Sequence, residues 1–552
     1  MKVFHLLLIT MLSLTLSCDS AKQDSPRNAD YYDVVVYGGT SGGVVAAVQA
    51  AAEGKSVVLI ESGSHLGGLT SGGLGATDIG NKGAIGGRSR DFYRRVANHY
   101  RKDESWVYEG KEDYNSKRGY DAEEELMWTF EPHVAERIMN TLVTEANVPV
   151  VLGERLDLSG GVGKEGTRII SLRCESGRVF SGGMFIDATY EGDLLALAGV
   201  SYTVGRESNS AYGETLNGVQ TANSVYHTFD KPVSPYIIAN DPNSGLLPGI
   251  DPTGPGEEGA GDNRVQAYCF RMCLTDAPEN QVPFAKPAGY DSLVFEPLFR
   301  YFEAGYDDRL PWLPTLMPNR KTDTNNRQGF STDYIGENYT FPEADYATRD
   351  KIIAAHLEYQ KGLMWSLSYH PRVPEDVREQ ISRWALAADE FTGNDNWPHQ
   401  LYVREARRMV SGYVMTQHNC QGGEVAEDPV GLAAYTMDSH HVQRYVDDDG
   451  LLKNEGDVQV GGFGPYPISY RSIVPQKSEC TNLLVPVCLS ATHIAFGSIR
   501  MEPVFMVLGQ SAATAACQAL DKGVAVQDID YGQLREKLLA DGQYLTWDSA
   551  RN

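Results

Sequence analysis

The segment VVVYGGTSGGVVAA, residues 34–47, combines residue types and spacings that fit two different chemistries. Read as GxSxG, the run GTSGG at residues 39–43 matches a nucleophile elbow, in which Ser41 would act as a catalytic alcohol. Read as GGTSGG at residues 38–43, the same run is a dinucleotide-binding turn whose middle glycine is replaced by Thr40. The elements that position these residues decide between a hydrolase and a nucleotide-binding protein.

The neighbouring residues predict a βαβ unit of about thirty residues. Residues 33–37 predict a short apolar strand, residues 44–53 an Ala/Val-rich helix, and residues 56–60 a second apolar strand. A nucleophile elbow needs an oxyanion-hole amide from a loop on an earlier strand, but the residues before 33 predict only a signal peptide and a polar tether. The unit therefore favours the dinucleotide-binding interpretation.

Each part of the motif has a role in that interpretation. Gly38 makes the turn, Gly43 lets the helix approach the strand, and amides at the helix N-terminus face a pyrophosphate, with Ser41 as a phosphate contact. Glu61, which ends the second strand, accepts hydrogen bonds from ribose hydroxyls. The predicted cofactor-binding residues of this unit are Gly38, Gly39, Thr40, Ser41, Gly42, Gly43, Glu61 and Ser62.

Two further groups of glycines follow in the sequence, and only the first is expected to lie at the ligand. Gly67 and Gly68 follow in ESGSHLGGLTSGGLGATD, where we expect the backbone to pass close to a large flat ligand. The run SGGVGKEG at residues 159–166 also satisfies GxGxxG, but the residues after it predict a hairpin instead of a helix. We therefore interpret this second match as a glycine-rich turn.

Residues 33–68, DVVVYGGTSGGVVAAVQAAAEGKSVVLIESGSHLGG, resemble the N-terminal signature of FAD-dependent oxidoreductases related to the fumarate reductase flavoprotein superfamily. They are more closely similar to exported bacterial proteins of the FAD-dependent oxidoreductase family, whose members often carry the label xanthan lyase. The segment at residues 179–200, VFSGGMFIDATYEGDLLALAGV, resembles the strand and turn that return to the FAD site through Asp187. Here Tyr190 stands where the family usually has glycine.

A third block that carries the resemblance, residues 482–516, predicts a strand, a loop and an Ala-rich helix that begins near Glu502. In the superfamily, the N-terminal amides of this helix face the pyrimidine edge of the flavin and stabilise its anionic reduced form. The resemblance therefore implies that Arg500, Met501 and Glu502 lie at the flavin. It also implies that FAD is bound non-covalently, although His65 lies close to the glycine motif.

The resemblance covers most of the chain and implies an α/β fold. We expect a discontinuous, Rossmann-like FAD-binding domain of the glutathione reductase type, with an inserted α+β substrate domain. The predicted segments are a signal peptide at residues 1–18, a tether at 19–30, the first part of the FAD-binding domain at 31–215, the substrate domain at 216–460, the second part of the FAD-binding domain at 461–525, and a C-terminal helix and tail at 526–552.

The catalytic base is expected among the histidines. Oxidation of an alcohol by a flavin needs a group that takes the hydroxyl proton, and histidine suits this role at neutral pH. His493 is the first candidate, because its loop immediately precedes the predicted flavin-facing helix. A hydrogen-bonded interior histidine is the alternative interpretation. His399 in NWPHQLY is a weaker candidate, for which packing or surface exposure is the alternative.

Arg404 and Arg500 complete the predicted catalytic set. Arg404 and Arg408 recur at helical spacing in YVREARRMV, so that they would share a helix face able to clamp a carboxylate or a phosphate. A structural ion pair with Glu405 is an equally good interpretation of these arginines. Arg500 is predicted to be catalytic because of its place before the flavin-facing helix.

The N-terminus and the composition indicate where the protein works. Lys2 and the apolar run at residues 3–16 predict a signal peptide, and Cys18 resembles the acylated cysteine of a bacterial lipoprotein, with signal cleavage near Ser17 as the alternative. We therefore expect an exported protein in the periplasm or on the outer membrane, attached to a membrane only through a lipid anchor. The net charge of -25 argues against a nucleic-acid partner. The eight cysteines show no metal-binding spacing.

The sequence thus predicts an FAD-dependent oxidoreductase that moves a hydride to flavin from a small polar substrate, such as a sugar or an oligosaccharide fragment, outside the cytoplasm. This places it in carbohydrate metabolism by analogy, with an electron acceptor that the sequence does not identify. Three alternatives stay open: a polysaccharide lyase that uses His or Tyr with Arg, a serine hydrolase that uses Ser41, and a protein that holds FAD without turnover.

Overall fold

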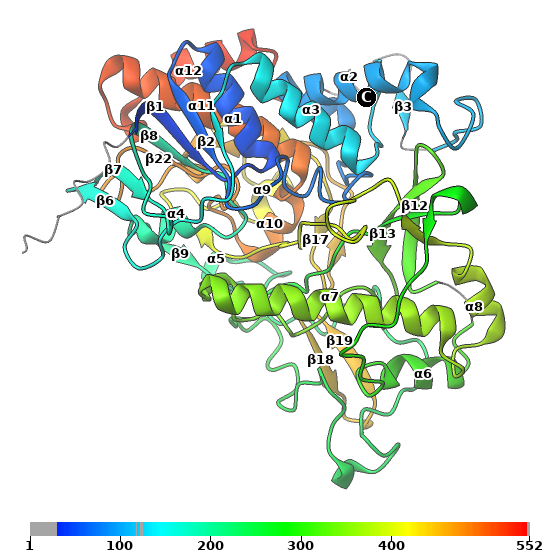
Figure 1. Cartoon of the computed structure of the whole chain (residues 1–552). Coiled ribbons are helices and arrows are strands. Elements are labelled where there is room, and N and C mark those ends of the chain that lie inside the picture. Colours follow the sequence, from blue (N-terminus) through cyan, green and yellow to red (C-terminus); the bar gives the residue numbers. More distant parts are fainter. Residues whose placement is uncertain (1–29, 117–118, 122–124, 308–309, 549–552) are drawn as a thin grey trace, which may run out of the picture.

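The computed structural model describes residues 30–116, 119–121, 125–307 and 310–548 (Figure 1). The predicted signal peptide, the lipid-anchor candidate Cys18 and all of the predicted tether except Asp30 lie outside these residues. Within them, helix α11 (Glu502–Lys522) is long and apolar enough to cross a membrane. It lies instead in the protein core, because it packs along α1 (Ser41–Ala52) and is almost entirely buried.

The strand that precedes the glycine motif lies at the centre of the first sheet. Strand β1 (Asp30–Tyr37) pairs in parallel with β2 (Val57–Ile60) on one side and with β8 (Val179–Asp187) on the other. Strand β2 and the last four residues of β1 are buried, as expected for central strands of a parallel sheet. The strand order is β5-β2-β1-β8-β7-β6, and β22 pairs with the end of β8. The outer strands are β5 (Val150–Val151), β6 (Val162–Glu165), β7 (Arg168–Arg173) and β22 (Leu483–Leu484).

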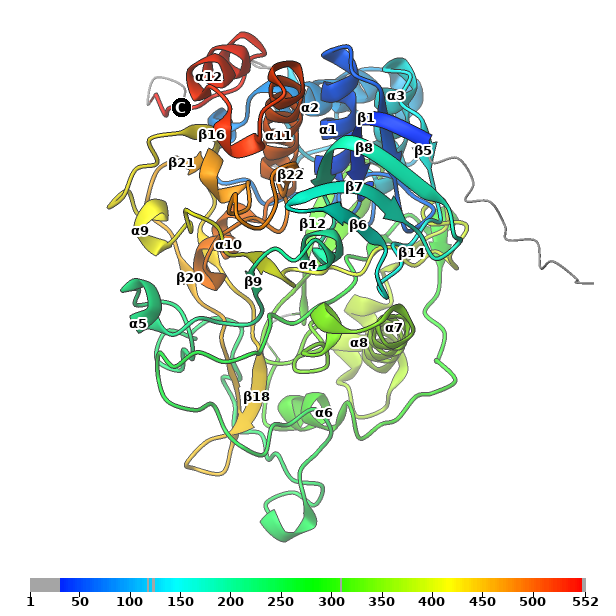
Figure 2. The ribbon, with the colours of Figure 1, turned by 90° about the vertical axis from the view of Figure 1, so that its left-hand side faces the viewer.

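Segments from both ends of the chain build this α/β unit, which confirms the predicted discontinuous domain. Strand β22 belongs to the sheet of β1, and α11 packs along α1. Small residues permit this contact, since a Cβ on Gly42 would lie 2.9 Å from the Phe505 carbonyl oxygen and one on Gly509 would lie 2.1 Å from the Gly42 carbonyl oxygen. Figures 1 and 2 show these blue and red segments together in the upper half of the molecule. The further helices of this half are α2 (Gly87–Tyr100), α3 (Pro132–Glu145) and α12 (Tyr531–Ala540).

Helix α1 begins three residues before its predicted start. Thr40 is its N-cap, and the Thr40 hydroxyl oxygen accepts a hydrogen bond from the Gly43 amide at 3.2 Å. This cap stabilises a first turn that contains two glycines, which by themselves disfavour a helix. The glycine motif therefore forms the turn and the first helical residues together. The second GxGxxG match lies in the β6–β7 hairpin, as predicted, with Gly166 in the turn at a φ of +58°.

The middle of the chain forms a second, antiparallel sheet with strand order β11-β14-β10-β13-β12. Helices α6, α7 and α8 lie in the lower part of the molecule in both views (Figures 1 and 2). This mixture agrees with the predicted α+β substrate domain. The strands are β10 (Cys273–Thr275), β11 (Gln281–Val282), β12 (Trp312–Met317), β13 (Lys321–Asn326) and β14 (Ala385–Ala387), and the helices are α6 (Glu296–Glu303), α7 (Tyr346–Tyr369) and α8 (Glu375–Ile381).

Short elements connect the two halves, and the exact domain boundaries stay predictions. Strand β16 (Pro429–Ala433) belongs by sequence to the predicted substrate domain, but the Ser511 hydroxyl on α11 donates to the Val430 carbonyl oxygen at 2.6 Å. This strand therefore packs on the first unit. The paired short strands are β3 (Tyr120–Asp121) with β4 (Leu126–Met127), β9 (Tyr202–Thr203) with β15 (Arg408–Met409), β16 with β21 (Tyr466–Ser469), β17 (Met437–Asp438) with β20 (Gln459–Val460), and β18 (Gln443–Val446) with β19 (Leu452–Glu455). The short helices are α4 (Asp193–Leu197), α5 (Asn209–Tyr212), α9 (Gln417–Cys420) and α10 (His493–Ile499).

Candidate functional site

A hollow of about 170 Å³ opens where β1, β2 and β8 end. Its lining comes from the three turns that follow these strands and from two loops. In open α/β sheets ligands bind at the carboxyl ends of the strands. The lining residues are Gly38 and Thr40 after β1, residues 61–65 after β2, residues 189–191 after β8, and Gly68, His399 and Gln400 from the loops.

The glycines at residues 38 and 43 fit closely against neighbouring backbone. Gly38 has a φ of +105°, and a Cβ there would lie 2.7 Å from the Ala188 carbonyl carbon. A Cβ on Gly43 would lie 1.9 Å from the Gly38 carbonyl oxygen, so that only glycine lets α1 approach the end of β1 this closely. Both glycines therefore have the roles that the dinucleotide-binding interpretation predicts.

Thr40, at the position of the missing glycine, links α1 to β8. Its φ of -62° is ordinary for any residue, and its hydroxyl donates to the Ala188 carbonyl oxygen at 2.7 Å. The threonine therefore caps α1 and holds the turns after β1 and β8 together. The N-terminus of α1 stays a favourable place for an anion such as a pyrophosphate.

Glu61 lies in the hollow at the end of β2, as predicted. Its two carboxylate oxygens accept hydrogen bonds from the amides of Gly39 and Gly63, both at 2.6 Å. Burial raises the pKa of Glu61, and these amides act against that rise. Ser62, also in the lining, donates to Glu61 at 3.2 Å.

The predicted glycine pair, Gly67 and Gly68, lies against the glycine turn at residues 38–43. The Gly67 amide donates to the Gly39 carbonyl oxygen at 2.7 Å, and Gly67 has a φ of +102°. A Cβ on Gly68 would lie 2.4 Å from the Tyr190 hydroxyl oxygen. The pair therefore brings the next loop to the edge of the hollow, where Gly68 is part of the lining.

Ser41 lies behind this lining and makes a different contact from the predicted one. Its hydroxyl donates to the Glu502 carboxylate at 2.5 Å, and its side chain is fully buried. The hydroxyls of Thr70 and Tyr190 also donate to this carboxylate, both at 2.7 Å. Burial raises the pKa of Glu502, while the three hydroxyls counteract this effect. The predicted contact of the Ser41 hydroxyl with a phosphate is therefore corrected to a contact with Glu502.

The geometry at Ser41 predicts that it is unreactive. A serine nucleophile needs a base within hydrogen-bond reach and an accessible oxygen, whereas the Ser41 hydroxyl is buried and donates to Glu502. We expect an acylating fluorophosphonate reagent to leave Ser41 unlabelled, as measured by mass spectrometry of the intact protein and its peptides. A single adduct on Ser41 that disappears in Ser41→Ala would revive the hydrolase interpretation.

Asp187 acts on the hollow indirectly. Its carboxylate accepts hydrogen bonds from the Thr189 hydroxyl at 2.7 Å and from the Leu195 amide at 2.9 Å. Burial raises the pKa of Asp187 to about 6. Asp187 lies beneath the turn after β8 and holds it in place, whereas Thr189 and Glu191 line the hollow. Its predicted cofactor contact is thereby corrected to a supporting role.

The loop at residues 67–78 leads from the hollow to a group of polar and charged side chains, which we call the inner cluster. Its members are Arg271, Asp323, Asp333, Tyr402, Arg404, Asp438 and Arg500. A Cβ on Gly73 would lie 1.9 Å from the Arg271 carbonyl oxygen, and the Ala76 amide donates to Asp323 at 3.1 Å. Arg271 in turn donates two hydrogen bonds to Asp323, at 2.8 and 2.9 Å. The same loop therefore touches both regions.

Three arginines surround Tyr402 in the inner cluster. The guanidinium carbons of Arg404, Arg500 and Arg271 lie 4.6, 5.7 and 6.0 Å from the centre of its ring. Arg500 also donates to the Tyr402 hydroxyl at 2.7 Å. Arg271 and Arg404 are neutralised by Asp323 and Asp333. Arg500 is only 4 % exposed, yet it forms no ion pair with any residue that the structure describes, and its Nε atom has no hydrogen-bond partner there.

An unpaired, buried guanidinium suits an anionic or strongly polar ligand. Arg500 stands two residues before Glu502, and Met501 between them is the N-cap of α11. Because Glu502 contacts Ser41 and Tyr190, the start of α11 joins the hollow to the inner cluster. The structure thus brings together the three residues that the resemblance placed at the flavin.

The predicted base His493 lies in a closed ion network. It is 2 % exposed, and its Nδ1 atom lies 2.8 Å from Glu405. Glu405 also pairs with Arg408 at 3.0 Å, and Arg408 pairs with Glu207 at 2.6 Å. His493 begins helix α10 and does not line the hollow. The structure therefore favours the interior-histidine interpretation and corrects the catalytic one.

This network predicts a specific loss of stability in acid. Burial acts to raise the pKa of Glu405, but His493 and Arg408 lower it to about 2. A carboxylate with a lowered pKa stabilises the fold above its ordinary value and loses that contribution as the pH falls. We expect Glu405→Gln to remove about 3 kcal/mol of the decrease in unfolding free energy between pH 4.5 and 2, measured by urea unfolding. The surface variant Glu145→Gln is the control. Equal acid dependence in Glu405→Gln and the wild type would contradict this account.

The predicted helix through Arg404 and Arg408 is wrong. Residues 401–407 form no helix, and Arg408 belongs to β15. The two side chains have separate partners, because Arg404 pairs with Asp333 at 2.8 Å while Arg408 pairs with Glu405 and Glu207. Arg404 therefore forms a structural ion pair, although it stacks against Tyr402. The positions of the two arginines are set by ion pairs with acidic residues, most of them distant in the sequence, and not by a shared helix.

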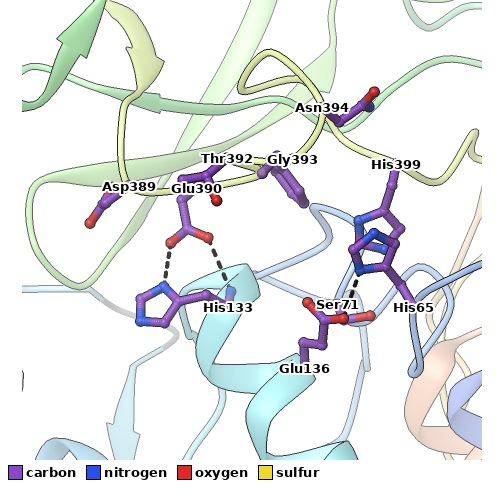
Figure 3. Close-up of a pocket in the computed structure, with 11 residues that line it drawn as sticks. His65, Ser71, His133, Glu136, Asp389, Glu390, Thr392, Gly393, Asn394 and His399 are labelled. Atoms are coloured by element: carbon purple, nitrogen blue, oxygen red, sulfur yellow. Dashed lines mark hydrogen bonds and ion pairs between the residues drawn. The ribbon is translucent and has the colours of Figure 1, made fainter.

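His399 borders both the first hollow and a second one of about 140 Å³ (Figure 3). Its ring stacks on that of His65 at 3.8 Å between centres, and His65 pairs with Glu136 at 2.7 Å. Burial and the His65 charge lower the pKa of His399 to about 4. His399 is therefore neutral at pH 7 and lies between the two hollows.

A cluster beside the second hollow has the donor atoms of a metal site. The ligand atoms of Glu131, His133 and Glu390 lie within 4.8 Å of one another, and Figure 3 shows His133 paired with Glu390. The ammonium of Lys321 already neutralises this cluster, since it contacts Glu131 and Glu390 at 2.7 Å and Asp389 at 2.8 Å. The cation at this position is therefore a lysine.

Three residues of the site were not predicted from the sequence. Glu191 lines the hollow, and burial raises its pKa to about 7. Tyr402 and Asp438 belong to the inner cluster and keep part of their surface accessible. An available signal was the density of Asp and His in YTMDSHH around Asp438, which is unusual for an ordinary turn.

The residues present fit an FAD molecule. The glycine turn, the N-terminus of α1 and Glu61 match the needs of a pyrophosphate and a ribose, and the unpaired Arg500 offers donors farther in. The hollow and the inner cluster are connected by the loop at residues 67–78. The site therefore suits a long ligand with a nucleotide at one end and a polar ring at the other.

Comparisons with known proteins agree with this geometry. The model of a family described as FAD dependent oxidoreductase matches residues 33–538. No curated protein sequence matches the chain. Among solved structures, L-proline dehydrogenase from P. horikoshii shows 17% identity and a TM-score of 0.23 over 33% of this chain and 59% of its own. L-amino acid deaminase from Proteus vulgaris shows 16% identity and a TM-score of 0.23 over 33% of this chain and 54% of its own. This chain thus covers less than two thirds of either protein.

Proposed function

Since the chain belongs to the FAD dependent oxidoreductase family, we propose that it oxidises a small polar substrate, such as a sugar or a glycan fragment, by hydride transfer to non-covalently bound FAD. The observation that carries the proposal is the connection between the hollow at the ends of β1, β2 and β8 and the inner cluster. The loop at residues 67–78 borders both, and the start of α11 contacts Ser41 on one side and carries Arg500 on the other.

Different residues of the chain bind the cofactor and the substrate. The amides at the start of α1 hold the pyrophosphate, and Glu61 accepts hydrogen bonds from the ribose. FAD, when bound, supplies the acceptor for a hydride. Arg500 and Tyr402 orient the polar groups of the substrate, because the guanidinium is unpaired and the phenol is partly accessible. The surrounding ion pairs Arg271–Asp323 and Arg404–Asp333 hold this arrangement in place.

The proposed site of action is outside the cytoplasm, in the periplasm or on the outer membrane through a lipid anchor on Cys18. The predicted signal peptide and the polar tether support this proposal. The carbohydrate substrate rests on export and on the polar character of the inner cluster. Neither the lyase nor the hydrolase alternative is favoured, since a lyase needs no dinucleotide site and the Ser41 hydroxyl is fully buried.

Anaerobic reduction of the flavin tests this function. Purified protein is mixed without oxygen with a panel of aldoses, sugar alcohols and uronic acids, and the visible flavin band is followed. We expect at least one class to bleach the flavin and air to restore the band. Bound FAD that no member of the panel bleaches would contradict the carbohydrate proposal. An unsaturated uronate formed without any electron acceptor would favour the lyase.

A further inference from the structure

The inner cluster contains one carboxylate that no neighbour holds. Asp438 ends β17, and its backbone oxygen accepts a hydrogen bond from Arg500 at 3.1 Å. Helix α10 packs against the same oxygen, because a Cβ on Gly497 would lie 2.6 Å from it. The backbone of Asp438 is therefore fixed. Its carboxylate forms no hydrogen bond or ion pair with any residue in the described parts of the chain, and its side chain keeps some accessible surface.

The other acids of the cluster have partners. Asp323 accepts two hydrogen bonds from Arg271, and Asp333 accepts hydrogen bonds from Arg404 and His440 at 2.8 and 2.9 Å. These partners leave little capacity for a substrate. Two more acids have partners: Asp457 accepts from Gln459 at 3.0 Å through one oxygen, while its other oxygen is buried and has no hydrogen-bond partner among the described residues, and Asp78 has an interaction partner.

The nearby histidines are engaged as well. His440 contacts Asp333, and burial lowers its pKa well below the ordinary value. His441 contacts the His227 carbonyl oxygen at 3.0 Å, and burial lowers its pKa to about 4. His493 contacts Glu405. Because these rings are held by other groups, the proton acceptor of an alcohol oxidation has to be sought among the acids.

Resting on the proposed function, we propose that Asp438 is the catalytic proton acceptor for the hydroxyl group that the protein oxidises. As the O–H bond breaks, its proton passes to the Asp438 carboxylate. The electron pair of that bond forms the C=O bond, while the C–H bond breaks and its hydride leaves for the flavin. The substrate therefore loses one proton and one hydride and becomes a carbonyl compound. Arg500, on the backbone oxygen of Asp438, fixes the acceptor beside its own unpaired guanidinium.

The charges around Asp438 suit this role. Burial raises its pKa to about 7, and the negative charges of Asp78 and Asp333 add to the rise. The positive charges of Arg500 and Arg404 act in the opposite direction. Two further groups face this region: Asp457, whose pKa burial and Asp438 raise well above the ordinary value, and His440, which is neutral. A base with a pKa near the working pH is the most effective proton acceptor.

The first test measures flavin reduction in the holoenzyme. With a substrate that bleaches the wild type, Asp438→Asn should lower the anaerobic rate of reduction by about 100- to 10,000-fold while FAD stays bound. The wild-type rate should rise with pH through about 7 as the carboxylate loses its proton, and this rise should be absent in the variant. Asp438→Glu should restore part of the rate. Asp350→Asn, the same change at an exposed carboxylate that pairs with Arg155, is the matched control and should keep the rise.

The second test needs no substrate. A carboxylate whose pKa is raised in the folded state destabilises the fold progressively as the pH rises from its unfolded pKa of about 4 to its folded pKa of about 7. Asp438→Asn should therefore match the wild type in its urea midpoint at about pH 3.5 and exceed it at about pH 8. A variant with the wild-type rate, or with no gain of midpoint at the higher pH, would overturn the inference. If no substrate reduces the wild type, the proposed function fails, whereas the difference in midpoint still reports on Asp438.

Discussion

The Gly43→Ala variant should lose its FAD on purification. The added Cβ would lie 1.9 Å from the Gly38 carbonyl oxygen, which is backbone and has no rotamer into which it can move. Helix α1 must therefore move away from the turn, and its N-terminal amides move with it. Overpacking of this kind costs about 1–3 kcal/mol, and the upper end corresponds to FAD binding weakened about 100-fold. The measurement is the ratio of flavin to protein absorbance after gel filtration.

A matched control comes from the second GxGxxG match. Gly166→Ala places its Cβ in open space at a φ of +58°, so that it strains the β6–β7 turn by about 1 kcal/mol without touching the hollow. This variant should keep its FAD. Glu61→Ala separates cofactor binding from helix packing, because it removes the carboxylate from the hollow and leaves the glycines in place. Full FAD occupancy in Gly43→Ala would contradict the assignment of the turn.

The Lys321→Met variant should be strongly destabilised. The ammonium of Lys321 is fully buried and forms ion pairs with Glu131 and Glu390, which are also buried. Methionine keeps most of the length of the side chain but removes the positive charge between these carboxylates. Removing one partner from a buried ionic network typically costs about 3–5 kcal/mol. We expect a loss of this size in the unfolding free energy at neutral pH, measured by urea unfolding.

The sign of the pH dependence distinguishes this mechanism from simple loss of packing. Without Lys321, the carboxylates raise each other's pKa, and one of them takes up a proton in the folded state. The variant should therefore regain stability relative to the wild type as the pH falls. The exposed pair Lys477–Asp528 supplies the control Lys477→Met, which should cost less than about 1 kcal/mol. A Lys321→Met variant as stable as this control would show that the cluster contributes little.

The first unit of the fold could be predicted because its signals are local. The apolar strands, the glycine turn and Glu61 lie within about thirty residues, and the geometry of a βαβ unit fixes their relation. The start of α11 near Glu502 was also predicted, and Pro503 in its first turn agrees with it, because proline favours that position of a helix. The second GxGxxG match was correctly rejected because no helix pattern follows it.

The inner cluster could not be predicted, because its contacts join distant segments. Arg404 meets Asp333, 71 positions earlier, and His493 meets Glu405, 88 positions earlier. No local pattern reports such partners, so a histidine near the flavin-facing helix resembled a base and two arginines at helical spacing resembled a helix. Asp438 could not be predicted for a related reason, because the sequence does not show that its carboxylate has no hydrogen-bond partner among the described residues.

The visible absorption spectrum of the purified protein shows whether the chain binds FAD. We expect a flavin band and a chromophore that heat releases without proteolysis and that is identified as FAD. This result would verify the site built from Gly38, Gly43 and Glu61. A colourless protein that also fails to bind added FAD would contradict the account.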